Sequence, residues 1–335
     1  MTREISGEAL ARRGLQRVST LCCTAGYLLL LIVIYFGTRH SQLEQNLGPK
    51  FFWAFLSFAL LMAPLWFFGF DVAERVRNLL TSRWLRTLIP ATLVLPYFVF
   101  SLPTHQFRWT YALGMLGLPV VLSALLEFST LDTKLHWQDA VVLAVLAATH
   151  ILKIFQGAWP LAGLASLPKL FVINTALYLY LMVRNLEGVG YRLIAPRQTL
   201  VIGLREWLYF LPFGLGLGTL LHFTHFHPML PAPFGLIGAI VLTFLLVATP
   251  EEIFFRGILQ NLLETRLGQR SSLLLAAVLF GLGHFNKGAG FNWRYVLLAA
   301  IAGIFYGRAW RGQRQLLASI ITHTAVDVVW SLWFR

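Results

Sequence analysis

The amino-acid sequence predicts an all-α, polytopic transmembrane helical bundle of about ten spans, and composition and hydropathy both indicate it. The chain has 335 residues, of which 57% are hydrophobic and only 12% are charged, and its mean hydropathy is +0.68. A soluble domain carries about a quarter charged residues, so this chain lacks the polar side chains needed to cover a surface in water. Much of its surface must therefore face the lipid bilayer.

Long apolar stretches follow one another along the whole chain. Only helices and closed barrels satisfy their own backbone hydrogen bonds in lipid, and these stretches are too long and too uniformly apolar for barrel strands. Glycine and proline interrupt some of them, so we expect ten spans, give or take one. The eleven candidates are residues 18–37, 51–70, 85–102, 111–129, 139–156, 164–183, 207–223, 234–262, 272–286, 295–310 and 315–333.

The first stretch follows a cluster of four arginines, Arg3, Arg12, Arg13 and Arg17. This arrangement resembles a signal sequence, but no small-residue cleavage site follows it, so we expect an uncleaved first helix. Alternating sides through the eleven candidates places most of the 27 Lys and Arg residues on the side of the N-terminus. The positive-inside rule then predicts a cytoplasmic N-terminus, in a multi-pass protein of a bacterial inner membrane.

The net charge of +13 raises the question of a nucleic-acid partner. The basic residues lie between apolar runs and not along one stripe, which is how membrane proteins mark their cytoplasmic loops. We therefore expect the lipid bilayer as a partner, and no nucleic acid.

The chain divides at the segment 184–206, which holds four arginines and Pro196. Residues 1–190 contain about six spans with little polar content and are predicted to be accessory transmembrane helices. Residues 200–335 form a second region, in which the stretch from Trp207 to Pro250 contains no Asp, Glu, Lys or Arg.

That uncharged stretch ends at two adjacent carboxylates, Glu251 and Glu252. Charged side chains at bilayer depth cost several kcal/mol and are functional candidates by default. Arg256 lies four residues after Glu252 on the same helical face and is expected to pair with it. Glu251 then points about 100° away and is available for chemistry. The alternative is that the two carboxylates only mark a helix end at the membrane interface.

Two further polar clusters lie on the following apolar spans. His284 ends the run Phe280-Gly-Leu-Gly-His, and His323 lies four residues before Asp327 on one helical face. A single histidine in an apolar helix is usually a core residue, but three polar clusters on successive spans favour a shared site. Their chemistry is complementary, because a carboxylate can act as general base on water while histidines bind a metal or stabilise an oxyanion.

In order, these three clusters resemble the motifs of the CPBP intramembrane proteases, over roughly residues 200–335. This family groups CAAX prenyl endopeptidases with bacterial relatives, some of them linked to bacteriocin processing and immunity. The resemblance implies that Glu251 activates the attacking water with support from Glu252 and Arg256. It also implies that His284 and His323 position that water, bind a metal or stabilise the tetrahedral intermediate.

The last motif commonly has Asn where this chain has Asp327. An ionised Asp cannot donate a hydrogen bond to an oxyanion, so a protonated Asp327, or one that orients His323, would be needed. The resemblance nevertheless implies an intramembrane endopeptidase that cleaves a membrane-associated protein or peptide. A non-catalytic membrane scaffold, or a bacteriocin-immunity-type protein that retains the motif, is the alternative.

The involvement of a metal is open at this point. Glu251, His284 and His323 are acceptable zinc ligands by type. The family has been described both as metalloproteases and as glutamate-dependent enzymes, and we favour the glutamate-dependent mechanism without a metal.

Overall fold

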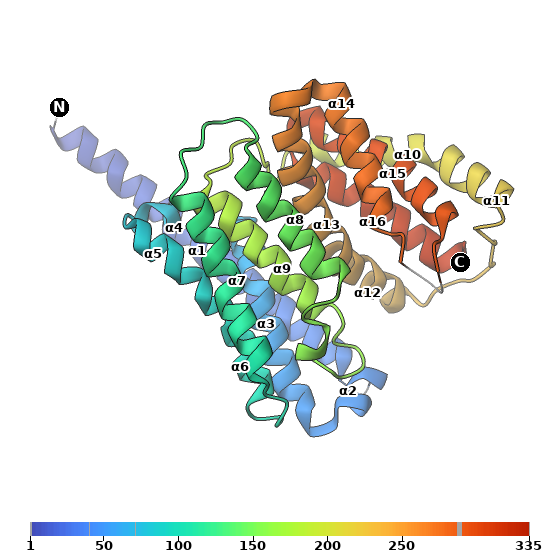
Figure 1. Ribbon diagram of the computed structural model, residues 1–335, viewed down its shortest axis with the longest axis horizontal. Helices are drawn as coiled ribbons and strands as arrows, with labels where there is room; N and C mark the ends of the chain where they lie inside the picture. Colours follow the sequence, from blue (N-terminus) through green and yellow to red (C-terminus); the bar gives the residue numbers. More distant parts are fainter. Residues whose placement is uncertain (1, 40, 71, 287–289, 335) are drawn as a thin grey trace.

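The protein is described here by a computed structural model that covers residues 2–39, 41–70, 72–286 and 290–334, with side chains from Thr20 onward. Every regular element in these ranges is a helix (Figure 1). The α-helices are α1 (Thr2–Thr38), α2 (Gln42–Leu47), α3 (Phe51–Phe68), α4 (Val72–Leu79), α5 (Arg83–Leu88), α6 (Leu95–Ser101), α7 (Trp109–Glu127), α8 (Trp137–Ile151), α9 (Leu167–Tyr178), α10 (Arg197–Leu211), α11 (Gly218–Leu220), α12 (Pro233–Thr243), α13 (Thr249–Glu252), α14 (Asn261–Leu282), α15 (Trp293–Gln313) and α16 (Leu316–Trp333).

Short 3₁₀ and π segments extend or connect these helices. The 3₁₀ segments are η1 (Gly48–Lys50), η2 (Ile89–Val94) and η3 (Gln156–Ala158), and the π-helical segments are η4 (Leu179–Val183), η5 (Pro212–Leu217), η6 (Phe244–Ala248) and η7 (Ile253–Gln260).

Seven helical segments in the described ranges are long and apolar enough to cross a membrane. Two shorter apolar helices, Trp137–Ile151 and Leu167–Val183, lie where the sequence predicted further spans. The predicted helical polytopic bundle is therefore confirmed, whereas the count of ten spans is not. The seven segments are Thr20–Thr38, Gln42–Phe68, Arg83–Ser101, Trp109–Glu127, Arg197–Leu220, Pro233–Leu282 and Leu316–Trp333.

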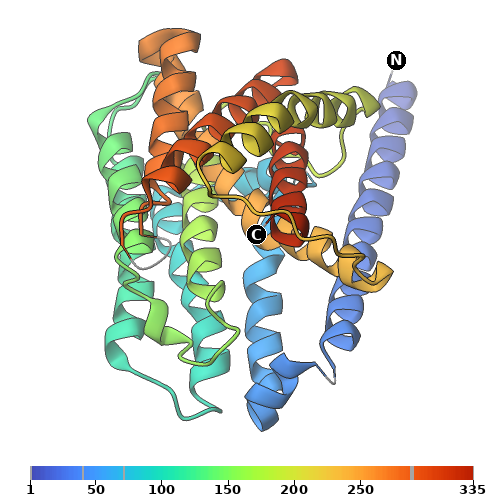
Figure 2. The same ribbon diagram turned by 90° about the vertical axis from the view of Figure 1, so that its right-hand side faces the viewer.

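The segment Pro233–Leu282 joins two predicted spans into 50 helical residues. A straight helix of that length would reach about 75 Å, more than twice the hydrocarbon thickness of a bilayer. Gly268 breaks it with a φ of 70°, a left-handed value that glycine adopts without steric cost. The orange part of the chain turns back on itself (Figure 2), and the rings of Phe255 and Phe280, one from each side of the break, lie 5.1 Å apart.

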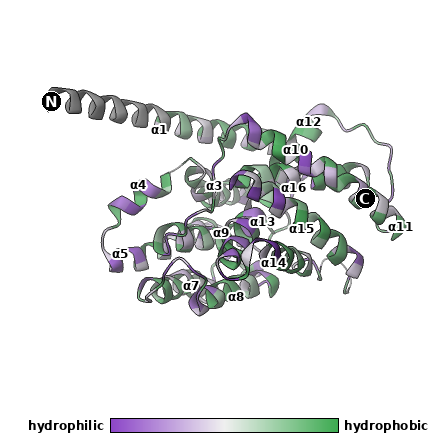
Figure 3. Ribbon diagram, turned by 90° about the horizontal axis from the view of Figure 1, so that it is seen from above, coloured by the Kyte–Doolittle hydropathy of each residue, from purple (hydrophilic) through white to green (hydrophobic). Residues whose placement is uncertain are grey.

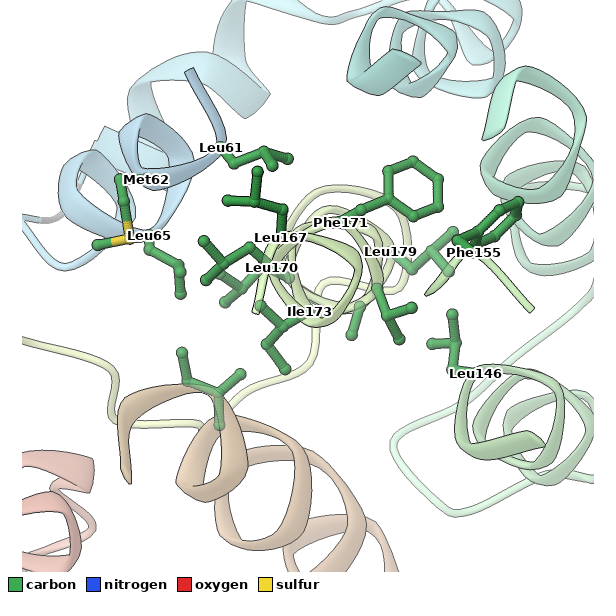
Figure 4. Packing of buried hydrophobic residues seen from close by; sticks show 14 of the residues in the cluster. Leu61, Met62, Leu65, Leu146, Phe155, Leu167, Leu170, Phe171, Ile173 and Leu179 are labelled. Carbon is green, nitrogen blue, oxygen red and sulfur yellow. The ribbon is translucent and has the colours of Figure 1, made fainter. Parts of the chain in front are cut away.

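Helix α9 lies at the centre of the molecule. All of its residues are buried except Lys169, which is partly buried. Figure 4 shows its side chains, Leu170 and Phe171 among them, enclosed by apolar residues of the surrounding helices. The outer surfaces of the bundle are mostly hydrophobic, while a hydrophilic stretch at α13 lies inside it (Figure 3). A helix that is apolar on all sides belongs in a protein interior. A lysine in such a helix is unusual, because its charge must be compensated by a buried partner.

The basic connections gather at one end of the bundle. The Arg184 side chain donates to the Lys134 carbonyl at 2.9 Å, and Arg266 donates to the Leu135 carbonyl at 3.0 Å. The N-terminus and the turn at Gly268 lie at this same end (Figure 2). The side chains of the four N-terminal arginines lie outside the described ones.

The connection between the two halves of the chain depends on Gly190. Its φ is 68°, its carbonyl accepts from the Leu316 amide at 2.9 Å, and an added Cβ would lie 1.8 Å from the Arg314 carbonyl oxygen. We expect Gly190→Ala to destabilise the protein by more than the 1–2 kcal/mol or so of a left-handed residue alone. The measurement is the thermal midpoint of the purified protein in detergent.

Gly117→Ala is the matched control for this substitution. A Cβ at Gly117, inside α7, meets nothing within 4 Å. Alanine is favoured over glycine in a helix by up to about 1 kcal/mol, so this variant should melt at or above the wild-type temperature. Equal thermal midpoints for the Gly190 variant and wild type would contradict the close approach of Gly190 to the Arg314 carbonyl.

Candidate active site

The two adjacent carboxylates lie within a continuous helix. α13 ends with Glu251 and Glu252 and continues directly into the π-helical segment η7, while η6 precedes it. The alternative that these residues mark a helix end is therefore wrong. Single π-helical turns widen the backbone and occur often at functional sites, because they change the direction in which side chains project.

Glu252 and Arg256 form the ion pair that their spacing predicts. Arg256 Nη1 lies 3.0 Å from Glu252 Oε1, and neither side chain is exposed. Arg256 Nη2 also donates to the Gly303 carbonyl at 3.1 Å, and the guanidinium lies 4.4 Å from the centroid of the Phe280 ring. A buried charge of either sign requires such compensation, so this pair ties η7 to α14 and α15.

Glu252 also holds His323. His323 Nδ1 lies 2.7 Å from Glu252 Oε1, and Ser319 Oγ donates to the other carboxylate oxygen. The imidazole stacks on Tyr306 with a centroid distance of 4.5 Å and an interplanar angle of 15°. These contacts aim Nε2 toward Glu251, whose Oε2 lies 3.8 Å away.

Asp327 lies on the open side of the same imidazole. Its Oδ2 is 3.5 Å from His323 Nε2, and its side chain is about one-third exposed. The i, i+4 spacing therefore brings the two together as predicted. In this position the Asp327 carboxylate can orient His323. This is one of the two roles open to an Asp at a position where the family commonly has Asn.

His284 reaches the site from the end of α14. Its Nδ1 lies 2.8 Å from the Phe280 carbonyl oxygen, so Nδ1 carries the hydrogen. Its Nε2 then points to Glu251 Oε2 at 4.0 Å. The side chains predicted from three separate motifs thus meet around one carboxylate oxygen.

The other oxygen of Glu251 contacts a residue that was not predicted. Lys169 Nζ lies 2.7 Å from Glu251 Oε1, and both side chains are largely buried. Lys169 belongs to α9, in the first half of the chain. It is the only charged residue in the apolar stretch 164–183, and that isolation was the signal that could have found it.

Two cavities meet at the site. An aromatic cavity of about 90 Å³ lies among α10, α15 and α16 and is lined by Trp207, Tyr295 and Trp330, with His323 and Asp327 in its wall. An inner cavity of about 110 Å³ lies between α8, α9 and the segment around Glu251, with Lys169 in its wall. His284 lines both cavities. Both cavities are mostly apolar, and the reacting groups supply polar atoms to the walls between them.

The predicted zinc ligands have the right chemistry but too wide a spacing. Two ligands of a tetrahedral zinc lie about 3.4 Å apart, given bond lengths of about 2.1 Å. The imidazole nitrogens lie 3.8 and 4.0 Å from Glu251 Oε2. Within the described ranges no group of three or more His, Cys, Asp or Glu side chains is arranged to hold a metal ion. The geometry thus lends no support to a zinc ion at Glu251, His284 and His323, the candidate set that the sequence left open.

The fold and the site together define a polytopic helical membrane protein with a buried carboxylate–histidine cluster. Residues 233–329 match the sequence model of the family described as type II CAAX prenyl endopeptidase Rce1-like. This segment contains all six predicted site residues, and the match confirms the family inferred from the three motifs. Over this segment, the chain is similar to CAAX-type intramembrane proteases. No match was found among curated proteins or among solved structures.

Proposed function

We propose that the protein is an intramembrane endopeptidase in which Glu251 is the general base. The observation that carries this proposal is the convergence of His284 and His323 on Glu251 Oε2, at 4.0 and 3.8 Å, next to a cavity. Each gap is too long for a direct hydrogen bond, and a water placed beside the three atoms, on their cavity side, can contact the carboxylate and both rings. Glu251 takes a proton from this water, whose oxygen attacks the peptide carbonyl, and the proton then passes to the departing amine.

The two histidines have different tasks in this mechanism. His284 donates from Nδ1 to the Phe280 carbonyl, so in its neutral form Nε2 accepts a hydrogen bond from the water and orients it. His323 is held by Glu252 and Asp327, and in its doubly protonated form it donates from Nε2 to the developing oxyanion. Glu252 and Arg256 act by positioning His323.

The substrate class that we propose is a membrane-associated protein or peptide, cut at or near the bilayer. The proposed setting is a bacterial inner membrane with the N-terminus in the cytoplasm. Residues 200–335 form the protease core, and residues 1–190 form the accessory helices.

Replacing either histidine by alanine tests the site. We expect His284→Ala and His323→Ala each to lower cleavage by about 10²–10³-fold, since each removes one polar group from the water or the oxyanion. Mass spectrometry of protein termini in membranes would compare deletion cells that express wild type or variant. His105→Ala, at an exposed loop position, is the control and should cleave as wild type does. Full cleavage by both site variants would refute the proposed site.

A non-catalytic scaffold or immunity-type protein is the second candidate, and Asp327 in place of Asn favours it. Such a protein would bind a partner without cutting it. The two candidates differ in one result. If expression of His284→Ala gives the deletion strain the wild-type phenotype, and the protein termini are the same in wild-type and deletion cells, then binding is the function.

A further inference from the structure

We propose that helices α8 and α9 complete the site: they form a vestibule, polar in its outer part, that brings water to Glu251, and Lys169 at its inner end is a positioning residue for that carboxylate. This inference rests on the proposed function and deepens it. Both helices lie outside the segment 233–329 that matches the family.

The vestibule consists of two cavities that share a wall. The inner cavity, already described, contains Glu251 and His284. An outer cavity of about 460 Å³ adjoins it, and the two share the lining residues His150, Ile151, Lys169, Val172 and Gly283. Together they form a path from the connection between α8 and α9 to the carboxylate. This connection lies at the end of the bundle away from the basic loops (Figure 2).

The lining of the outer cavity is polar and basic. It includes His150, Lys153, Lys169, Gln156 and Asn286, and no Asp or Glu among the described residues lines it. Peptide hydrolysis consumes water, which the hydrocarbon core does not supply. The polar walls of the outer cavity let water remain there, and the polar side chains of the mostly apolar inner cavity, His150, Lys169, His284 and Glu251, can pass it on to the carboxylate. The aromatic cavity on the other side of His284 suits an apolar segment.

Lys169 is placed to hold Glu251 in its reactive orientation. Its ammonium contacts Oε1 at 2.7 Å, and Oε2 therefore faces the two imidazoles. Every other residue of α9 is buried, and α9 is enclosed by apolar side chains (Figure 4). A rigid helix thus fixes the stem of Lys169, and the lysine in turn limits the rotation of the carboxylate.

Thiol labelling tests the vestibule without any need for cleavage. Cys22 and Cys23 are first replaced by serine, and single cysteines are introduced at Ala165 in the outer cavity, at Ala147 in the inner cavity and at Ala148 as control. Ala148 lies on the exposed outer face of α8 and lines neither cavity. The purified protein in lipid nanodiscs is treated with a charged, membrane-impermeant methanethiosulfonate.

We expect the cysteines at 165 and 147 to react roughly tenfold or more faster than the one at 148, because only a thiolate in water is reactive. Equal, slow reaction at 147 and 148 would show that water does not reach the inner cavity and would overturn the vestibule. The labelling measures access of water and does not depend on cleavage, so it can be repeated in a Glu251→Gln background. A dry inner cavity would therefore be distinguished from a Glu251 that is not the general base.

Charge replacement tests the positioning role. We expect Lys169→Met to lower cleavage by roughly 10- to 100-fold, the usual cost of misplacing a reacting group. Lys169→Arg keeps the cation and should restore most of the activity. Lys134→Met is the matched control, because Lys134 is exposed in the loop before α8 and lines neither cavity.

The readouts are protein termini in complemented cells and the thermal midpoint of each variant. A structural role would lower the midpoint along with activity, whereas a positioning role lowers activity alone. Wild-type cleavage by Lys169→Met, or equal loss in the Met and Arg variants at unchanged midpoint, would overturn the assignment.

Discussion

Replacing Glu251 by glutamine is expected to lower peptide cleavage by about 10²–10⁴-fold while the fold persists. Glutamine has nearly the same shape, but its amide cannot take a proton from water. The neighbours that hold the side chain stay in place, since Lys169 can still donate to the amide oxygen at the position of Oε1. The loss should therefore fall on the chemical step and not on assembly of the bundle.

The measurement is the appearance of cleaved protein termini in deletion cells that express the variant at wild-type level. The thermal midpoint in detergent reports on folding. Glu74→Gln, at an exposed position of α4, is the matched control and should change neither quantity. Cleavage at the wild-type rate by Glu251→Gln would show that another group activates the nucleophile.

Replacing Arg256 by methionine is expected to have the largest effect on stability, a loss of about 3–5 kcal/mol. Methionine fills much of the same volume but leaves the Glu252 carboxylate, which has no exposed surface, without its cation. The contacts of the guanidinium with Gly303 and Phe280 are lost as well. Cleavage should fall with stability, because Glu252 positions His323.

A second substitution separates charge from packing. In the double variant Arg256→Met with Glu252→Gln the buried carboxylate is gone, so part of the lost stability should return. Arg39→Met is the control: it breaks a partly exposed pair with Glu44 at 2.6 Å, and such pairs contribute at most about 1 kcal/mol. Unfolding of the purified protein by heat in detergent measures all three. A double variant no more stable than the single one would argue against the unpaired carboxylate as the cause.

The class of fold followed from the sequence because hydropathy is a local property. Each apolar stretch reports its own preference for lipid, and the bundle confirms it. The number of spans did not follow in the same way. Residues 234–262 and 272–286 were predicted as separate spans, and the structure joins them into one helical segment that turns at Gly268. Hydropathy cannot distinguish a helical turn of this kind from a loop.

Within the site, contacts along one helix were predictable and contacts between helices were not. The pairs Glu252–Arg256 and His323–Asp327 are each four residues apart, so helical periodicity alone places them together. The family resemblance indicated that Glu251, His284 and His323 act jointly. Their distances, and the spacing that does not suit a zinc ion, depend on how α14 and α16 pack against η7.

Lys169 marks the limit of inference from this sequence. It lies 82 residues from Glu251 in the chain, and no periodicity links two side chains so far apart. The same holds for the inner cavity, whose walls come from residues 146–173 and 250–284. Local spacing was sufficient to predict a carboxylate paired with its arginine, and the resemblance of the three motifs indicated a family of intramembrane proteases. The ammonium of Lys169 beside Glu251, and the cavity next to both residues, exist only because packing brings α9 and the segment around Glu251 into contact.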